Sequence, residues 1–257
     1  MTDAWDELRR HTRARIGLGR AGNGLPTRRH LEFVAAQATA RDAVHAPLDV
    51  ASLADRLRAL RLGETTDGPG LGEPLRVRSA AADRDVYLRR PDLGRRPEEG
   101  TTLPHSGADI GIALCDGLSS TALLAHGPDL TAAIVRALPG LTFAPPVIAT
   151  QARVALGDHI GAQLGVTTML VLIGERPGLS VADSIGVYLT HHPEPGRRDS
   201  ERNCVSNIHP PHGMTCDHAA RVVSALVDGA RKLGESGVVL KDDSRDPSLT
   251  ESDRPAL

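Results

Sequence analysis

LVLIGERPGLS, residues 170–180, is the stretch of this chain that decides the fold. The apolar run from Met169 to Ile173 predicts a strand that is buried on both faces. The Pro-Gly pair at 177–178 favours a tight turn. Ser180 with Asp183 matches a capping box, so a short helix is predicted over Ser180–Gly186. A strand, a charged turn and a helix start in this order are typical of an α/β unit.

Glu175 and Arg176 directly follow this predicted strand. In an open parallel sheet, ligands bind outside the carboxyl ends of the strands. A solvated surface turn is the ordinary explanation for such a charged pair. We favour a functional role, because the pair is wedged between a buried strand and a rigid turn. Glu175 is therefore a candidate binding residue.

Working outward, strand and helix patterns alternate along most of the chain. This alternation predicts an α/β fold with a Rossmann-like, mainly parallel sheet flanked by helices, preceded by a smaller N-terminal helical region. The predicted helices span Ser119–Leu138, interrupted near Gly127-Pro128, then Ala155–Leu164 and Asp217–Leu233. The clearest further strands are Asp109–Leu114 and Val187–Thr190.

Other segments give weaker strand signals. Short extended pieces are expected at Val77, at Asp85–Leu88 and at Val238–Leu240. The run Phe143–Ile148 is partly apolar but contains two prolines. Proline cannot donate to a sheet ladder, so this run is expected to be an edge or irregular strand.

Three regions are expected along the chain. Residues 1–74 form an N-terminal helical region and linker, residues 75–240 form the α/β domain, and residues 241–257 form a disordered tail because they are polar and charged. The N-terminal patterns are helical at Asp3–Ile16, Thr27–His45 and Leu48–Leu62, followed by a Gly/Pro/Thr linker at Gly63–Pro74.

Composition excludes several broad classes. A net charge of -2 gives no argument for nucleic acid or a membrane surface. No apolar run approaches the ~20 residues that span a bilayer. Three cysteines without a CxxC pair predict no disulfide framework, which suits a reducing compartment. The amino terminus is acidic and has no signal-peptide core, so a cytoplasmic protein is expected.

Gly17–Gly22 matches G-x-G-x-x-G letter for letter. The dinucleotide fingerprint must follow a strand and open a helix within a βαβ unit. Here an Arg-rich helical segment precedes the glycines, so a nicotinamide or flavin site is not predicted. We expect a basic surface loop instead.

Three polar segments are further candidates. Asp116–Ser119 follows a predicted strand and suits either a binding rim or a loop with a helix cap at Ser119. Arg202–His209 has little periodicity and is expected to be a loop able to line a polar ligand. Within it, Cys204 has no base placed beside it, so it is expected to touch a ligand or the core rather than act as a nucleophile. His209 and His212 are expected to be loop histidines rather than metal ligands.

Taken together, these segments resemble the small subunit of ethanolamine ammonia-lyase. The most specific motifs are YLRRPDLGRR, GERPGL and CVSNIH. The matching stretches, in family order, are Thr12–Gly22, Tyr87–Arg96, Asp116–Ser119, Arg153–Gly161, Val171–Ser180 and Arg202–His209.

The resemblance implies an adenosylcobalamin-dependent enzyme that converts ethanolamine to acetaldehyde and ammonia. The family's large subunit, a TIM barrel, holds the substrate and the catalytic residues, so this chain has none. The small subunit covers the cobalamin, which makes 1–74 a docking region and 75–240 a cobalamin-binding domain. The family's cobalamin contacts fall on Val154, Glu175 and Cys204. No metal ligand is implied in this chain.

Two departures from family patterns matter. The chain lacks the longer amino-terminal extension of some members, so cytoplasmic location and enclosure in a bacterial microcompartment stay open. Asp158-His159-Ile160-Gly161 has the wrong spacing for the D-x-H-x-x-G motif, so cobalt is expected to keep its own dimethylbenzimidazole. The alternative function is a stand-alone cobalamin-binding α/β module without a catalytic partner.

Overall fold

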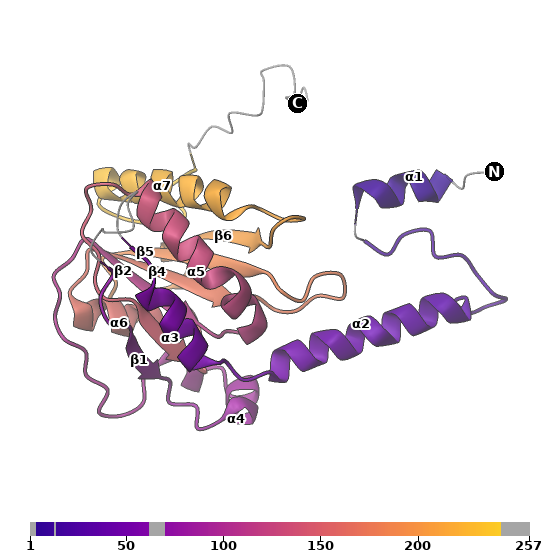
Figure 1. Ribbon diagram of the computed structural model, residues 1–257, viewed down its shortest axis with the longest axis horizontal. Helices are drawn as coiled ribbons and strands as arrows, with labels where there is room; N and C mark the ends of the chain where they lie inside the picture. Colours follow the sequence, from indigo (N-terminus) through magenta and orange to yellow (C-terminus); the bar gives the residue numbers. More distant parts are fainter. Residues whose placement is uncertain (1–3, 13, 62–69, 243–257) are drawn as a thin grey trace, which may run out of the picture.

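The structure is a computed structural model that describes residues 4–12, 14–61 and 70–242. Within these residues, the strands form one six-stranded sheet of order β1-β3-β2-β4-β5-β6 (Figure 1). The strands are β1 (Leu75–Arg78), β2 (Ile110–Cys115), β3 (Val147–Thr150), β4 (Thr168–Gly174), β5 (Ile185–His191) and β6 (Asn203–Ile208).

The direction of the strands defines one functional edge of the sheet. β1, β3, β2 and β4 pair in parallel, whereas β5 pairs antiparallel with both β4 and β6. β6 therefore runs in the same direction as β4. We call the edge at which these five strands end the carboxyl edge. The predicted α/β class with a mainly parallel sheet is confirmed.

Helices cover both faces of the sheet. Alternate residues of β2 point to opposite layers, since Ile112 and Leu114 belong to one apolar cluster and Ala113 and Cys115 to the other. The first cluster contains residues of α3, α5 and α7, and the second contains residues of α6. The helices are α3 (Val50–Arg58), α5 (Ser120–Ala137), α6 (Leu156–Leu164) and α7 (Cys216–Leu233).

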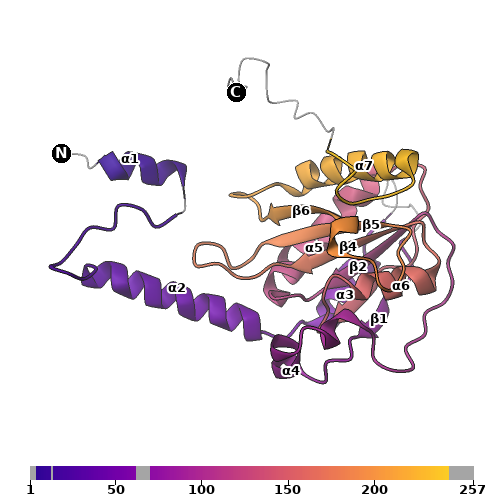
Figure 2. The same cartoon turned by 180° about the vertical axis from the view of Figure 1, so that it is seen from behind.

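The N-terminal helices lie away from this core. α1 (Ala4–His11) and α2 (Thr27–His45) extend to one side of the sheet in both views (Figures 1 and 2). None of the residues of α2 is buried, although the helix carries exposed Leu31 and Val34. The glycine-rich segment between α1 and α2 follows a helix rather than a strand, as the sequence predicted.

Two segments expected to be irregular or extended adopt a different structure. The expected extended piece at Asp85–Leu88 is wrong, because these residues belong to α4 (Arg84–Arg89). The side chain of Asp83 accepts the backbone N–H of Val86 at 2.8 Å and caps this helix. The expected loop Arg202–His209 is also wrong, because most of it forms β6. An edge strand exposes alternate polar side chains, and this hides the apolar periodicity that identifies inner strands.

The expected helix at Ser180–Gly186 is not formed. Glu175 N–H donates to the carbonyl of Ser184 at 3.0 Å, and Gly178 N–H donates to the carbonyl of Val181 at 2.7 Å. These bonds close a hairpin loop between β4 and β5. The chain must reverse its direction in this loop. The Pro-Gly pair favours such a turn, and this preference outweighs the helix-capping pattern of Ser180 and Asp183.

The expectation of an edge or irregular strand at Phe143–Ile148 is also wrong. The strand β3 lies between β1 and β2, inside the sheet. Its first residue is Val147, so Pro145 and Pro146 precede it and remove no donor from its ladder. The two prolines therefore stand directly before the first residue of an inner strand.

The predicted interruption of the helix near Gly127-Pro128 does not occur, because α5 is continuous. Proline cannot donate to the carbonyl four residues earlier, which here belongs to Leu124. The guanidinium of Arg56 in α3 donates to that carbonyl instead. A residue distant in sequence thus compensates for the proline.

The end of the chain contains one further correction. The expected strand at Val238–Leu240 is absent from the described residues there; Val238 and Val239 are exposed, while Leu240 packs on the core. Most of the expected linker and of the expected tail, residues 62–69 and 243–257, lies outside the described residues. Among the described helices, none is long and apolar enough to cross a bilayer.

Candidate functional site

A pocket of about 290 Å³ opens at the carboxyl edge of the sheet. It is lined by residues from five segments, among them Leu118 after β2, Val154 before α6, Glu175 after β4 and Tyr188 on β5. This volume lies at the small end of ligand pockets. The pocket therefore suits one part of a larger ligand that extends beyond it.

Two glycines bring the β2 and β4 ends together beneath this pocket. Leu118 N–H donates to the carbonyl of Gly174 at 2.9 Å. A Cβ at Gly117, whose φ is +55°, would lie 2.2 Å from that carbonyl oxygen. A Cβ at Gly174 would lie 2.0 Å from the carbonyl oxygen of Ser119. Only glycine permits this close approach.

Glu175 lies where the sequence placed it, directly after β4 and half-buried in the pocket wall. Its two carboxylate oxygens accept the backbone N–H of Asn207 at 3.2 and 3.3 Å. A Cβ at Gly186 would lie 3.0 Å from Oε1, so a glycine makes room for the carboxylate over β5. A carboxylate has about four lone-pair sites, so Glu175 keeps capacity to accept from a ligand.

Cys204 lies on β6 directly opposite Tyr188 on β5. The side chains of Cys204 and Tyr188 share a hydrogen bond, and Tyr188 also lines the pocket. Desolvation raises the pKa of the Cys204 thiol, and the Glu175 charge raises it further. The thiol is therefore protonated near neutral pH, which agrees with the expectation that Cys204 is not a nucleophile.

Val154 also lines the pocket, at the turn that leads into α6. Its carbonyl accepts the N–H of Gly157 at 2.9 Å in the first turn. Val154 and Glu175 thus share one pocket, and Tyr188 connects that pocket to Cys204. The pattern of residues around Val154 carried no signal of this position; only the family resemblance indicated it.

Reading the sequence by residue type missed an aromatic platform beside the pocket. Tyr87 is fully buried, and its hydroxyl donates to the carbonyl of Ala152 at 3.1 Å. The guanidinium carbons of Arg84 and Arg153 lie 4.8 and 4.4 Å from the centre of its ring. Only two tyrosines occur in the chain, and both line this pocket. The rarity of tyrosine in this chain was the sequence signal that could have identified these two residues.

Asp116 supports the structure of the site and is not part of the pocket rim. The side chain is buried and accepts the backbone N–H groups of Gln151 and Ala152 at 2.8 and 3.0 Å. Arg84 lies 3.5 Å away and balances its charge. Asp116 thereby joins the ends of β2 and β3. Ser119 is confirmed as the N-cap of α5, since it accepts the N–H of Ala122 at 3.2 Å.

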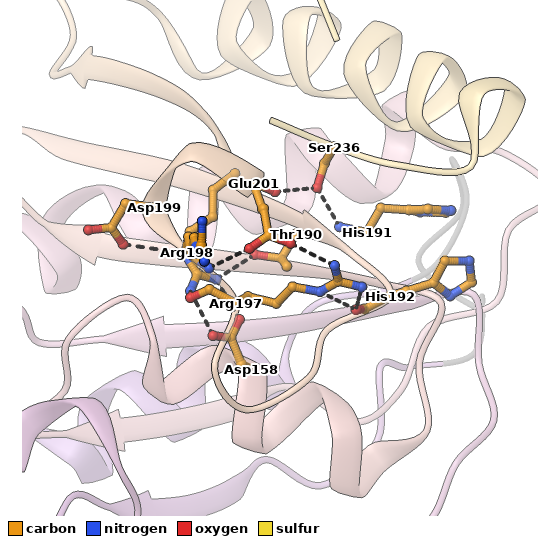
Figure 3. Close-up of polar contacts among 10 residues, drawn as sticks. Asp158, Thr190, His191, His192, Arg197, Arg198, Asp199, Glu201 and Ser236 are labelled. Carbon is orange, nitrogen blue, oxygen red and sulfur yellow. Dashed lines mark hydrogen bonds and ion pairs between the residues drawn. The ribbon is translucent and has the colours of Figure 1, made fainter. Parts of the chain in front are cut away.

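A buried ion pair connects α6 to the start of β6 (Figure 3). Asp158 of α6 accepts two bonds from Arg202, at 2.5 and 2.7 Å, and each side chain is 2% exposed. The hydroxyl of Thr190 and the carbonyl of Arg197 accept further bonds from the same guanidinium. Val154 precedes Asp158 by four residues and Cys204 follows Arg202 by two, so this pair links the two segments.

Two of the described histidines bond to neighbouring side chains. The ring of His191 shares a hydrogen bond with Thr168, and the ring of His209 shares one with Asn207. Across the part of the chain that the structure describes, no group of three His, Cys, Asp or Glu residues is arranged to hold a metal ion. The side chains that line the pocket offer hydrogen bonds and apolar contact.

Comparison with known proteins gives a consistent result. The family model described as ethanolamine ammonia-lyase light chain (EutC) matches residues 2–241. The chain is 58% identical over 244 residues to the ethanolamine ammonia-lyase small subunit of Rhodococcus erythropolis, covering 95% of this chain and 91% of that protein. It is 46% identical over 250 residues to that of Azotobacter vinelandii, covering 93% and 88%. It is 45% identical over 251 residues to that of Bradyrhizobium diazoefficiens, covering 93% and 91%.

Proposed function

Because the chain belongs to the ethanolamine ammonia-lyase light-chain family and is a small subunit of this lyase, we propose that it binds adenosylcobalamin against the large catalytic subunit. The complete enzyme converts ethanolamine to acetaldehyde and ammonia. The large subunit, a TIM barrel, carries the substrate site and the catalytic residues. This chain covers the cofactor from the other side.

The convergence of three segments on or beside the pocket at the carboxyl edge supports this proposal most strongly. Val154, Glu175 and Cys204 are separated by more than twenty residues in sequence, yet all lie on or beside one pocket around Tyr188. Ligands of α/β sheets bind at this edge. In the proposal, these three residues contact the corrin ring.

The chemistry of the pocket fits a cobalamin. The rim of a corrin carries neutral amide side chains, and Glu175 keeps the capacity to accept hydrogen bonds from an amide NH₂. Val154 and Ile173 supply apolar contact in the same pocket. Gly186 leaves the space in which the carboxylate lies.

The cobalt is not held by this chain in the proposal. Asp158 bonds to Arg202 and so does not orient His159 as a cobalt ligand. In the proposal this chain would then supply no ligand to the cobalt, as the spacing of the sequence motif predicts.

The residues of this chain bind and orient the cofactor and exclude water from it. When bound, adenosylcobalamin supplies the radical that starts the elimination of ammonia. Glu175 accepts hydrogen bonds from a corrin amide, while Val154 and the β5–β6 surface cover the ring. Of residues 1–74, α1 and α2 dock on the large subunit, whereas α3 packs in the core of the domain whose residues 75–240 bind the cofactor. We place the enzyme in the cytoplasm; whether a microcompartment encloses it is a separate question.

Co-expression of this chain with an ethanolamine ammonia-lyase large subunit tests the proposal. The co-purified complex, given ethanolamine and adenosylcobalamin, should release ammonia, and neither subunit alone should do so. A chain that binds no large subunit but binds cobalamin alone would support the stand-alone binding module instead. A complex that releases ammonia without cobalamin would contradict the proposal.

A further inference from the structure

Arg153 places a positive charge in the carboxyl-edge pocket that no other described residue neutralises. Its Nε atom is buried without a hydrogen-bond partner. Within the described ranges, no ion pair and no hydrogen bond joins its guanidinium to another residue. Buried polar groups in proteins are nearly always paired, so this atom calls for an explanation.

The guanidinium is held in position rather than mobile. It stacks on the buried ring of Tyr87 at 4.4 Å. The backbone N–H of Arg153 donates to the carbonyl of Gly94 at 2.8 Å. A Cβ at Gly94 would lie 2.9 Å from Cγ of Arg153, so the side chain packs closely against this glycine. A cation fixed in this way is prepared to bind a ligand without further ordering.

The other arginine on the same ring, Arg84, has partners within the chain, although its Nη2 atom is also buried without one. Arg84 donates to the carbonyl of Val44 at 2.7 Å and lies 3.5 Å from Asp116. Arg84 is therefore a structural cation with partners in the chain. Arg153 has the same aromatic contact but faces the pocket, where its partner must come from outside this chain.

The pocket thus combines a donor and an acceptor. The guanidinium of Arg153 can only donate hydrogen bonds, and the carboxylate of Glu175 can only accept them. Val154 and Ile173 add apolar surface beside them. A primary carboxamide on an apolar frame matches this combination, since its C=O accepts and its NH₂ donates. A ligand carboxylate would meet the like charge of Glu175, and a ligand ammonium would meet that of Arg153.

We propose that Arg153 donates a hydrogen bond to the carbonyl of one corrin carboxamide and, together with Glu175, selects the amide over the carboxylate at that position. This inference rests on the proposed cobalamin-binding function. Arg153 is then a specificity-determining residue of the cofactor site, in addition to the contacts that the family resemblance indicates.

The test uses the co-purified complex and four ligands, intact cobalamin and its three monocarboxylic acids, each with one propionamide hydrolysed. Equilibrium titration by absorbance gives each affinity. One acid isomer should bind the wild-type complex at least tenfold more weakly than intact cobalamin. Glu175→Gln should strengthen that isomer's binding and weaken that of intact cobalamin. A wild-type complex that binds all three acids as well as the amide would overturn the inference.

Variants of Arg153 complete the test. Arg153→Gln should weaken intact cobalamin by roughly tenfold to a hundredfold, the range for a hydrogen bond to a charged group. Arg153→Lys keeps the charge but loses the planar fork, so it should recover only part of the loss. The matched control is Arg136→Gln, which removes an exposed charge outside the pocket and should change affinity less than threefold, roughly the range for an exposed charge.

The outcomes separate this inference from the proposed function. If Glu175→Ala loses cobalamin while Arg153→Gln and Arg153→Lys bind it normally, the role of Arg153 is wrong and the cobalamin site stands. If no pocket variant changes cobalamin binding, both proposals fail. If the Arg153→Gln complex does not assemble, the affinities of the three acids for the wild-type and Glu175→Gln complexes still test whether the site selects the amide over the carboxylate.

Discussion

At the scale of single residues, Glu175 is a side chain on which cofactor binding is expected to depend strongly. Glu175→Ala should weaken cobalamin binding by the complex roughly fivefold to a hundredfold, which corresponds to a hydrogen bond of about 1–3 kcal/mol. β4 and the glycines beneath the pocket are untouched, so assembly should survive. Cobalamin titration of the purified complex measures the effect, with melting temperature as the folding control.

Cys204→Ala is the matched comparison for this variant. A thiol is a weak hydrogen-bonding group, so its removal should cost less affinity than the removal of Glu175. The raised pKa of Cys204 also leaves little thiolate to react near neutral pH. A Glu175→Ala complex that binds cobalamin like wild type, or that fails to assemble, would refute the role assigned to this turn.

The residues of the site were predictable from sequence to different degrees. Glu175 follows a buried apolar strand, and that position alone indicates the ligand-binding edge of an α/β sheet. Val154 and Arg153 precede a helix without any distinctive pattern, and their position depends on how α6 crosses the sheet. The partners of Arg153, Tyr87 and Gly94, lie more than fifty residues away in sequence. Local patterns do not encode such contacts.

At the scale of elements, the pair Asp158 and Arg202 connects α6 to β6. Removing one partner leaves an uncompensated buried charge, which costs about 3–5 kcal/mol. Arg202→Met should therefore lower the melting temperature by roughly 6–20 °C. Asp158→Leu combined with Arg202→Met should recover much of the loss, because the remaining charge is also removed.

An exposed ion pair provides the control for this experiment. Arg136 and Asp217 are 3.4 Å apart, with side chains 52% and 75% exposed. Exposed pairs contribute about 0–1 kcal/mol, so Arg136→Met should shift the melting temperature by only a few degrees. Equal shifts for Arg202→Met and Arg136→Met would show that the buried pair does not hold these elements together.

Asp109 joins the start of β2 to α7 and should make stability depend on pH. Hydrogen bonds from the backbone and side chain of Thr142, and then the contact with Arg231, hold the pKa of Asp109 at about 2, below its ordinary 3.8. A lowered pKa stabilises the fold above the ordinary value, and this stabilisation is lost as the pH falls towards 2. Asp109→Asn should cost about 1 kcal/mol near neutral pH, since the group is partly exposed.

The pH dependence of Asp109→Asn is measured from melting temperatures of wild type and variant between pH 7 and pH 2. The difference should stay constant down to about pH 4 and shrink below it, because the wild-type carboxylate becomes protonated. A difference that grows as the pH falls would contradict the assigned cause.

Strand and helix elements were predicted where local pattern and burial agree. β2 and β4 are continuous apolar runs, and α6 and α7 carry apolar residues at helical spacing; the structure confirms all four elements. β6 was missed because only Val205 and Ile208 of this strand are buried. α5 was predicted with a break because the donor that satisfies Leu124 comes from Arg56, which no local pattern shows.

At the scale of the whole molecule, the N-terminal helices are expected to dock on the large subunit. Leu31 and Val34 of α2 are 60% and 45% exposed, and exposed apolar patches commonly mark interfaces. The isolated chain should therefore be poorly soluble or oligomeric. Leu31→Glu with Val34→Glu should increase the monomer fraction in sedimentation experiments and reduce co-purification with the large subunit. Gln37→Glu, on the same helix, controls for added charge.

A well-behaved monomer of the wild-type chain at high concentration would contradict this account of α2. So would a doubly substituted chain that co-purifies with the large subunit as efficiently as wild type. The isolated chain should also release no ammonia from ethanolamine with adenosylcobalamin, because the proposal places the catalytic groups on the large subunit.

The most direct test of the central claim is a cobalamin titration of three samples: the large subunit alone, this chain alone and the reconstituted complex. If this chain supplies one face of the cofactor site, the complex should bind cobalamin at least tenfold more tightly than either subunit alone. Glu175→Ala should remove part of that gain. A large subunit that alone binds cobalamin as tightly as the complex would contradict the claim that this chain forms part of the site.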